Sequence, residues 1–251
     1  MLLATLKNFL DDELDIDDFT DDASLNGLQV EGSGKVSKIT LAVDACDLSI
    51  KKAARGRSDM LIVHHGLFWG GSEPITGILK RRIARLLKNG ISLYAAHLPL
   101  DFHREIGNNA QIAAMLKMND ISYFGNYMVK EIGICGKLPR PVSTGGLSRK
   151  INRILRTQVK SNPFGPSRIE KLAIVSGSGA SLASEAVKTG CDALLTGESS
   201  HAVYHPSREE GITLLYAGHY ATETPGVKAL GKLLEKKFNL KTKFVDIPTG
   251  L

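Results

Sequence analysis

Two adjacent histidines stand where an apolar segment of the chain ends. His64 and His65 follow the run MLIV, and Gly66 comes directly after them. Imidazole nitrogens are good ligands for first-row divalent metals. Because side chains alternate along a regular strand, the two rings would point to opposite faces unless Gly66 lets the chain turn. The end of this strand therefore predicts one imidazole for each of two neighbouring ions.

A second pattern, a histidine followed four residues later by a carboxylate, occurs twice. The segment LYAAHLPLD aligns with LYAGHYATE, which places His97 on His219 and Asp101 on Glu223. Such a pair can converge on one face of a helix or across a tight strand-to-helix turn. Asp101 alone could equally cap a helix, and Glu223 alone could be a solvated glutamate in a first helical turn. Together with the histidine pair, the two patterns favour a metal site.

Five side chains make up the predicted metal site, and two more are candidates for catalysis. The five are His64, His65, Asp101, His219 and Glu223. His97 is ambiguous, because a hydrogen bond to a ligand is at least as reasonable a function for it as direct metal binding. Glu198, at the end of LLTGE, takes the place of His65 in the second half of the chain. Both His97 and Glu198 are candidates for moving protons.

Other polar and aromatic segments give weaker signals. His201 and His205 have helical spacing, but no carboxylate follows them, which favours a role at the surface or towards substrate. Phe68 and Trp69 predict a hydrophobic lid or an oligomer contact, with base stacking as the alternative. The glycines of SGSGAS, at 176–181, could let an anion bind at a helix N-terminus. A complete dinucleotide or P-loop pattern is missing.

Short apolar runs alternate with helical patterns along the chain. This alternation predicts an α/β protein with largely parallel or mixed sheets. Strands are predicted at 39–45, 60–65, 91–97, 172–177, 192–197, 212–219 and 242–247. Helices are predicted at 2–11, 48–56, 75–89, 108–117, 147–158, 180–189 and 225–238. The region 120–170 interrupts this order, because GKLPRPVSTGG and SNPFGPS have the composition of turns.

The chain divides into two similar halves in this interpretation. Residues 1–125 contain HHG and HLPLD, and residues 126–251 contain TGE and GHYATE. In both halves the order is strand, turn, helix, an aspartate and a second strand. Open α/β sheets bind ligands beyond the carboxyl ends of their strands, where the candidate ligands all fall. We therefore expect the metal site in a cleft between the halves.

Composition excludes several classes of protein. The chain has 251 residues, 43% apolar residues and a net charge of +6. No apolar run is long enough to cross a bilayer, and the acidic N-terminal segment does not resemble a secretory signal. Cys46, Cys135 and Cys191 are odd in number and widely spaced, which predicts a reducing, cytoplasmic setting. Solvated helix faces explain the positive charge most simply, and a phosphate-bearing substrate or nucleic acid is the alternative.

Six segments together resemble the hallmarks of the Nif-three-like dinuclear-metal proteins, which are also known as GTP cyclohydrolase I type-two homologues. The segments are NGLQVEG, IVHHGLFW, HLPLD, GNNAQIA, LLTGE and GHYATE. The resemblance covers essentially the whole chain, in the family's short bacterial form. It implies a two-metal centre with His64, His65, Asp101, His219 and Glu223 as ligands, the glutamate bridging. It also implies a homohexameric toroid with the metal sites facing an internal cavity.

A metal pair suggests hydrolysis, because two ions about 3.5–4 Å apart activate water and stabilise both attacking and leaving oxygens. The first hypothesis is therefore a hydrolase for a nucleotide or another small polar molecule, with ring opening of GTP as one version. The donor set suits Zn, Fe, Mn, Co or Ni. A non-enzymatic metal-binding or metal-transfer protein and a nucleic-acid-binding ring are the alternatives.

Overall fold

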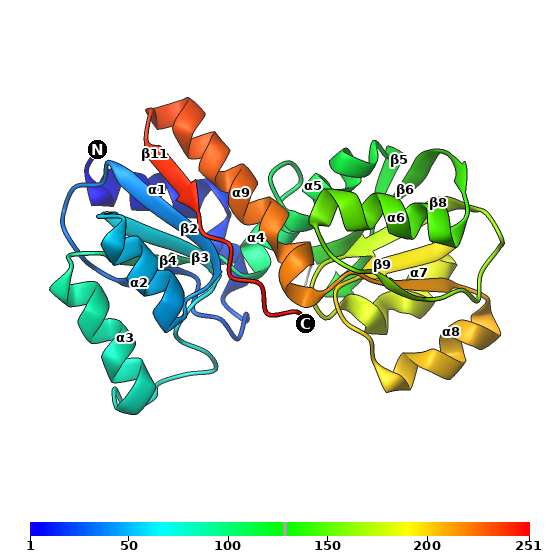
Figure 1. The fold of residues 1–251 in the computed structure, drawn as a ribbon, viewed down its shortest axis with the longest axis horizontal. Helices are drawn as coiled ribbons and strands as arrows, with labels where there is room; N and C mark the ends of the chain where they lie inside the picture. The colour runs from blue at the N-terminus through cyan, green and yellow to red at the C-terminus, as the bar shows by residue number, and fades with distance from the viewer. Residues whose placement is uncertain (128–129) are drawn as a thin grey trace. The chain divides into compact units, whose positions relative to one another are not determined.

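The chain forms two compact units in the computed structural model, which describes residues 1–127 and 130–251 (Figure 1). Unit 1 consists of Met1–His103 and Gly226–Ile247, and unit 2 consists of Arg104–Pro225 and Pro248–Leu251. The sequence was divided at residue 125 according to its repeated motifs, whereas these bounds follow the packing of the chain. The two units are therefore described separately.

The described residues of unit 1 form a five-stranded sheet in the order β1-β4-β3-β2-β11. Its strands are β1 (Gly27–Val30), β2 (Lys38–Asp44), β3 (Met60–His65), β4 (Ser92–Ala95) and β11 (Lys241–Phe244). All neighbours are parallel except β1, which pairs antiparallel with β4. Its helices are α1 (Leu3–Glu13), η1 (Ile16–Phe19), α2 (Asp47–Arg55), α3 (Gly77–Lys88), α4 (Leu98–Phe102) and the end of α9 (His219–Phe238).

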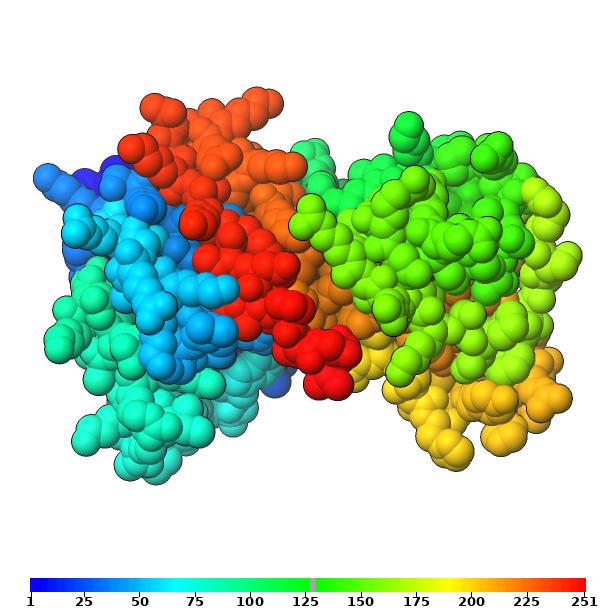
Figure 2. All heavy atoms as spheres, viewed as in Figure 1, coloured from blue at the N-terminus to red at the C-terminus, as the bar shows by residue number. Residues whose placement is uncertain are grey.

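Helices cover both faces of this sheet. Ile50 of α2 and Leu86 of α3 pack with Leu61 and Leu93 on one face. On the other face α9 approaches β2 so closely that a Cβ on Gly231 would lie 2.2 Å from the Leu41 side chain. Strands buried on both faces read as continuous apolar runs, as β3 does until its two histidines. Figure 2 shows the segment after β11 lying over unit 1 beside α2, where Lys52 donates to the Asp246 carbonyl.

The described part of unit 2 contains a six-stranded mixed sheet in the order β5-β6-β8-β9-β10-β7. Its strands are β5 (Asn119–Tyr127), β6 (Lys130–Val142), β7 (Lys160–Asn162), β8 (Ile169–Val175), β9 (Ala193–Thr196) and β10 (Thr213–Tyr216). Strands β8, β9 and β10 are parallel, and the others pair antiparallel. Its helices are α5 (Asn108–Leu116), α6 (Thr144–Leu155), η2 (Gly179–Leu182), α7 (Ala183–Lys188), η3 (His201–Val203), α8 (Tyr204–Glu210) and the start of α9.

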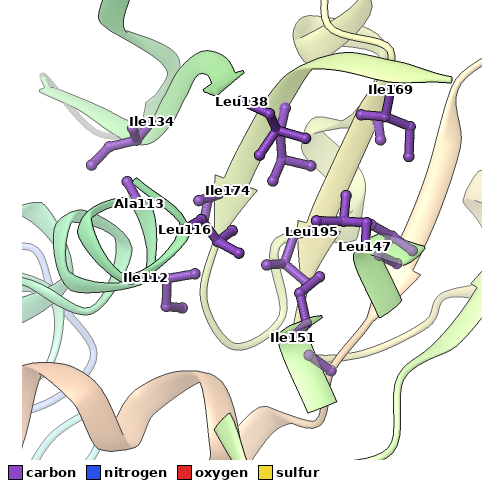
Figure 3. Packing of buried hydrophobic residues seen from close by; sticks show 14 of the residues in the cluster. Ile112, Ala113, Leu116, Ile134, Leu138, Leu147, Ile151, Ile169, Ile174 and Leu195 are labelled. Atoms are coloured by element: carbon purple, nitrogen blue, oxygen red, sulfur yellow. The ribbon is translucent and has the colours of Figure 1, made fainter. Parts of the chain in front are cut away.

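The core of unit 2 also lies on both faces of its sheet. On one face, Ile112 of α5 and Ile151 of α6 pack with Ile174 and Leu195 of the central strands (Figure 3). On the other face, α7 packs over a second apolar cluster that includes Ala173 of β8. Each unit is thus a sheet between helical layers, and the predicted α/β class with two mixed sheets is confirmed.

The end of β6 lies in GKLPRPVSTGG, where the sequence predicted a turn, and that prediction was wrong. Pro139 and Pro141 fall between Lys137 and Val142, where the ladder between β6 and β8 is interrupted. A proline there removes no ladder hydrogen bond, so strand and proline are compatible. Strand β6 therefore continues to Val142, and α6 then starts directly after the Ser143 cap.

Both units repeat one set of hydrogen bonds at the start of their central parallel strands. Asp59 Oδ2 accepts from the backbone N–H groups of Lys38 and the preceding residue, at 2.9 and 2.8 Å. Asp192 Oδ2 accepts from Lys171 and its predecessor at the same two distances. Each lysine ammonium also donates to a backbone carbonyl just after the helix that connects its strand pair. These matched contacts support the predicted repeat.

No helix among the described residues combines the length and the apolar character that crossing a membrane requires.

Candidate metal centre

The turn after β3 brings His64 and His65 together. Gln29 of β1 holds this turn, because its Oε1 accepts from the Leu67 N–H at 2.7 Å. A Cβ on Gly66 would lie only 2.2 Å from the Gln29 amide, so a side chain there would displace the group that holds the turn. The centroids of the two imidazole rings are 4.7 Å apart. The rings therefore lie side by side at the end of the strand, as a turn at Gly66 predicts.

Hydrogen bonds through Nδ1 orient both rings. His64 Nδ1 lies 2.9 Å from the Ala96 carbonyl oxygen, and His65 Nδ1 lies 2.9 Å from Asp44 Oδ1. A carbonyl and a carboxylate only accept hydrogen bonds, so Nδ1 carries the proton in each ring. In a neutral imidazole the other nitrogen, Nε2, then has the lone pair that a metal needs. Asp44 ends β2, directly opposite His65 in the parallel ladder.

His97 is held in the same manner at the start of α4. Its Nδ1 lies 2.9 and 3.1 Å from the two carboxylate oxygens of Asp22, whose side chain is only 1% exposed. Burial raises the pKa of Asp22, but hydrogen bonds from His97, Asn26 and a backbone N–H outweigh it and lower that pKa. The His97 backbone N–H also donates to Asn26 Oδ1 at 2.8 Å. The loop before β1 thus fixes both the ring and the backbone of His97.

Unit 1 gathers three imidazoles and one carboxylate in this way. One ligand nitrogen each from His64, His65 and His97 lies within 4.8 Å of the other two. Asp101, one turn into α4, places its Oδ2 3.4 Å from His64 Nε2. Trp69 covers this group, with its ring centroid 5.0 Å from that of His97 and its indole N–H donating to the Gly66 carbonyl. The indole position agrees with the predicted hydrophobic lid.

Unit 2 pairs His219 with two carboxylates. Strand β10 ends at Tyr216 and α9 begins at His219, so His219 and Glu223 lie one helical turn apart. His219 Nε2 is 2.9 Å from Glu223 Oε1, and His219 Nδ1 contacts Glu198 Oε1. Glu198 Oε2 in turn accepts from the Ser178 hydroxyl at 3.1 Å. The carboxylate–histidine–carboxylate chain thus brings together three residues that the sequence singled out.

The two carboxylates keep His219 protonated in the protein without metal. Burial lowers the pKa of His219, but the hydrogen bonds and charges of Glu223 and Glu198 outweigh it and raise the pKa to about 9. Both ring nitrogens then donate, Nδ1 to Glu198 and Nε2 to Glu223. A metal ion bound at Nε2 would take the place of one proton.

Glycines let the strand ends of unit 2 approach this chain closely. A Cβ on Gly177 would lie 2.6 Å from Glu223 Oε1. A Cβ on Gly197 would lie 2.7 Å from both the Gly177 carbonyl oxygen and His219 Cα. Two glycines therefore serve close packing against His219 and Glu223, and one of them belongs to the SGSGAS segment.

A search of known protein families gives a match over residues 1–249, to the family described as Duf34/NIF3 (NGG1p interacting factor 3). The chain belongs to the Duf34/NIF3 family. The resemblance predicted from its six motifs is thereby confirmed. Relatives from Archaeoglobus fulgidus and Pyrococcus abyssi, both named GTP cyclohydrolase 1 type 2 homolog, are each 44% identical to it. The matches cover 100% and 98% of both chains, respectively.

Solved structures agree with this assignment to the Duf34/NIF3 family. The structure of TTHA1606 from Thermus thermophilus has a TM-score of 0.92 and 43% identity, and the match covers 100% of both chains. Reduced HcgD from Methanocaldococcus jannaschii has a TM-score of 0.84 over 98% of both chains. Its identity is only 24%, so it shows a common fold alone.

The motifs of the Duf34/NIF3 resemblance include residues whose functions the sequence did not reveal. Asn26 and Gln29 of NGLQVEG position His97 and the turn after His65, respectively. Asp22 and Asp44, which orient imidazoles, were also missed. Asp44 had a readable signal, because it is a polar residue at the carboxyl end of a strand that neighbours the histidine strand.

Two further histidines of this Duf34/NIF3 protein, His201 and His205, belong to unit 2. His201 begins η3 and His205 lies in α8, and both side chains are exposed. The His205 ring contacts Tyr204, with 5.2 Å between the ring centroids. A surface role for this pair stays a prediction.

Proposed function

We propose that this Duf34/NIF3 protein binds two divalent metal ions through His64, His65 and Asp101 of unit 1 together with His219 and Glu223 of unit 2. One observation carries the proposal. Each of these three histidines has an oxygen acceptor at Nδ1, which leaves Nε2 as the atom that would bind a metal. In His219 the ion would replace the proton that Nε2 donates to Glu223. Metal-binding histidines in proteins have this arrangement, in which the acceptor fixes the ring and increases the basicity of the ligand.

The numbers and types of donor atoms favour ligands from both units. Unit 1 offers mainly imidazoles, and unit 2 offers one imidazole with one buried carboxylate. Two ions need more donors than either set supplies, and a carboxylate such as Glu223 can bridge two ions. Imidazole with carboxylate suits Zn, Fe, Mn, Co or Ni, so the donor set fits the metal pair that the resemblance implies.

Hydrolysis of a nucleotide or a similar small polar molecule is the reaction that we propose for this site. The relatives' name, GTP cyclohydrolase 1 type 2 homolog, supports this class. The bound ions would supply Lewis acidity and an activated water. His97 is suited to move a proton at Nε2, because Asp22 holds its other nitrogen and fixes the ring. Glu198 is suited to position His219 rather than to carry a proton, since both its oxygens accept hydrogen bonds.

We also propose, from the resemblance, that the chain assembles as a homohexamer in the cytoplasm, where its three free cysteines would stay reduced. Light scattering of the purified protein tests the assembly, with six times the chain mass of 27.1 kDa as the expected result.

Elemental analysis of the purified protein tests the metal proposal. Two ions per chain are expected in the wild type, and His64→Ala and Glu223→Gln should each lose at least one. His201→Ala is the matched control, because it removes an exposed imidazole outside the proposed ligands. Metal content that stays near two ions per chain in both ligand variants would overturn the proposed site.

Turnover tests the reaction separately. The protein, loaded with the metal that it holds after purification, is incubated with a panel of nucleotides, and product formation is followed by chromatography. Turnover that disappears in His64→Ala but persists in His201→Ala supports a hydrolase. Full metal content without turnover on any nucleotide favours the metal-binding or metal-transfer alternative.

A further inference from the structure

Two cysteines of unit 2, distant in sequence, meet beneath the turn between α7 and β9. Cys135 lies on β6, and Cys191 lies two residues before β9. Their Sγ atoms are 2.8 Å apart, and the two side chains are 0% and 7% exposed, respectively. Both pack in the apolar cluster on the α7 face of the sheet, away from the α5 and α6 layer. None of the proposed metal ligands belongs to this cluster.

The surroundings of the two thiols favour ionisation of one of them. The Thr189 hydroxyl lies 3.6 Å from Cys135 Sγ and 3.4 Å from Cys191 Sγ. The hydrogen bond from Cys191, helped by Thr189 and the charge of Lys171, lowers the pKa of Cys135 to about 6 despite burial. The same thiol–thiol hydrogen bond, together with burial, raises the pKa of Cys191. A thiolate beside a thiol is the reactive arrangement for thiol oxidation.

We propose that Cys135 and Cys191 form a reversible intrachain disulfide when the protein meets a hydroperoxide. A disulfide is about 2.05 Å long, so the sulfur atoms need to approach by only about 0.8 Å. In the first step one thiolate attacks an oxygen of hydrogen peroxide, the O–O bond breaks and a sulfenic acid forms. The hydroxide that leaves takes up the proton released when the thiol ionised, which gives water. In the second step the other thiol attacks the sulfenic sulfur and releases a second water. The peroxide accepts the two electrons that the thiols lose.

The turn beside the pair is open to solvent, and we expect a small oxidant to enter there. Gly190 is exposed and Thr189 is half-buried, whereas Cys135 lies fully buried below them. The third cysteine, Cys46, offers an internal comparison in unit 1. It is half-buried, and its Sγ accepts a hydrogen bond from the Ser49 N–H at the start of α2. An oxidant that reacts only with accessible thiols should oxidise Cys46. The proposed reaction instead links Cys135 to Cys191.

The new bond would tie β6 to the turn after α7. Its partners are 56 positions apart in the chain, so the disulfide closes a long loop and restricts the unfolded state strongly. We therefore expect the thermal denaturation midpoint to rise by several degrees on oxidation and to return on reduction.

Peptide mass spectrometry of the full-length protein under non-reducing conditions tests the proposal. The reduced protein is treated with hydrogen peroxide in small excess, quenched with catalase and digested after the remaining thiols are blocked. A peptide pair joined through Cys135 and Cys191, with two hydrogen atoms lost, is expected in the wild type and in Cys46→Ser. It should disappear after dithiothreitol treatment, and Cys191→Ser should lack it.

Two results would overturn the proposal. The first is that both buried thiols stay reduced while Cys46 is oxidised. The second is that Cys135 is oxidised to sulfinic acid without a cross-link, which would show that Cys191 cannot reach it. Because the wild type and Cys46→Ser both keep the buried pair, neither result depends on the folding of a core variant.

Discussion

The two units build the same framework but end their strands with different side chains. In the alignment of the halves, His65 falls on Glu198, and His64 falls on Gly197. The aspartate–lysine hydrogen bonds at the other end of these strands are nearly identical in the two units. The difference is therefore confined to the end of the strand that carries chemistry, while the end that holds the strands together is unchanged.

The room available at the strand ends explains why the two units carry different side chains there. In unit 1 the strand ends carry large polar side chains, and Asp44 orients His65. In unit 2 the corresponding positions are Gly177 and Gly197, and the start of α9 fills the room that side chains would need. His219 and Glu223, the ligands proposed for unit 2, lie at these strand ends instead. The repeated scaffold thus presents mainly imidazoles in unit 1, and two carboxylates beside one imidazole in unit 2.

The largest expected effect on stability comes from adding a side chain at Gly197 of unit 2. Gly197→Ala should lower the free energy of unfolding by about 3 kcal/mol, because the new Cβ meets two backbone atoms that cannot move separately. Urea denaturation measures this loss. Gly34→Ala in unit 1 is the control, since nothing lies within 4 Å of a Cβ there. Equal stability of the two variants would show that the close packing does not exist.

The shared framework predicts similar losses in both units. Asp59→Ala and Asp192→Ala should each cost about 1.5 kcal/mol of unfolding free energy, because each leaves two backbone N–H groups without their carboxylate. Asp59→Ala should lower the free energy of unfolding slightly more, because Asp59 also accepts a hydrogen bond from the Ser37 hydroxyl. Urea denaturation of the two variants measures both values. A loss in only one unit would contradict the repeat.

Acid titration sharpens this prediction for Asp59. Burial raises the pKa of this carboxyl, but hydrogen bonds from Ser37 and Lys38 outweigh it and lower the pKa below the ordinary 3.8. A lowered folded-state pKa means that the stabilisation is fully present above pH 3.8 and is lost as the pH falls towards the folded-state value. The stability difference between wild type and Asp59→Asn should therefore be constant near neutral pH and shrink below pH 3.8.

The smallest expected effect concerns the carboxylates that orient the imidazoles. Asp44→Asn and Glu198→Gln should each weaken metal binding by about tenfold, because a neutral amide holds the ring but increases its basicity less. The two carboxylate side chains are similarly exposed, at 38% and 46%, which makes the comparison fair. Competition with a chromogenic chelator for Zn²⁺ measures the affinities, with Glu209→Gln as the control. A loss in one variant only would show that the two units do not contribute equally.

Sequence patterns predicted the central strands and most helices, because buried parallel strands are continuous apolar runs and the helices are amphipathic. They failed at the end of β6, where prolines in an interrupted ladder look like turn residues. The start of α9 was also placed too late, at 225. The helix already begins at His219 and contains Pro225 in its interior.

For the candidate site, the predicted residues were those whose chemistry shows in their type. His64, His65 and His97 are imidazoles at the ends of apolar strands, and this position is readable in the sequence. Of the carboxylates that orient imidazoles, Asp44 also lies at a strand end, but Asp22 has no such position to mark it. Asp22 lies in an acidic segment and meets His97 only through a contact 75 positions apart in the chain. Such a partner emerges from the fold and not from local spacing.

The Nδ1 hydrogen bonds of the imidazoles also bear on how quickly an ion is captured. In the proposed site, Asp44, the Ala96 carbonyl and Glu198 already restrict the rotation of three imidazole rings, so binding a cation would cost little further rotational freedom. The entropy of ordering them belongs to folding instead of to binding. The capture rate should then follow how readily each cation sheds its hydration water, so that fast-exchanging ions enter first and the tightest binder replaces them later.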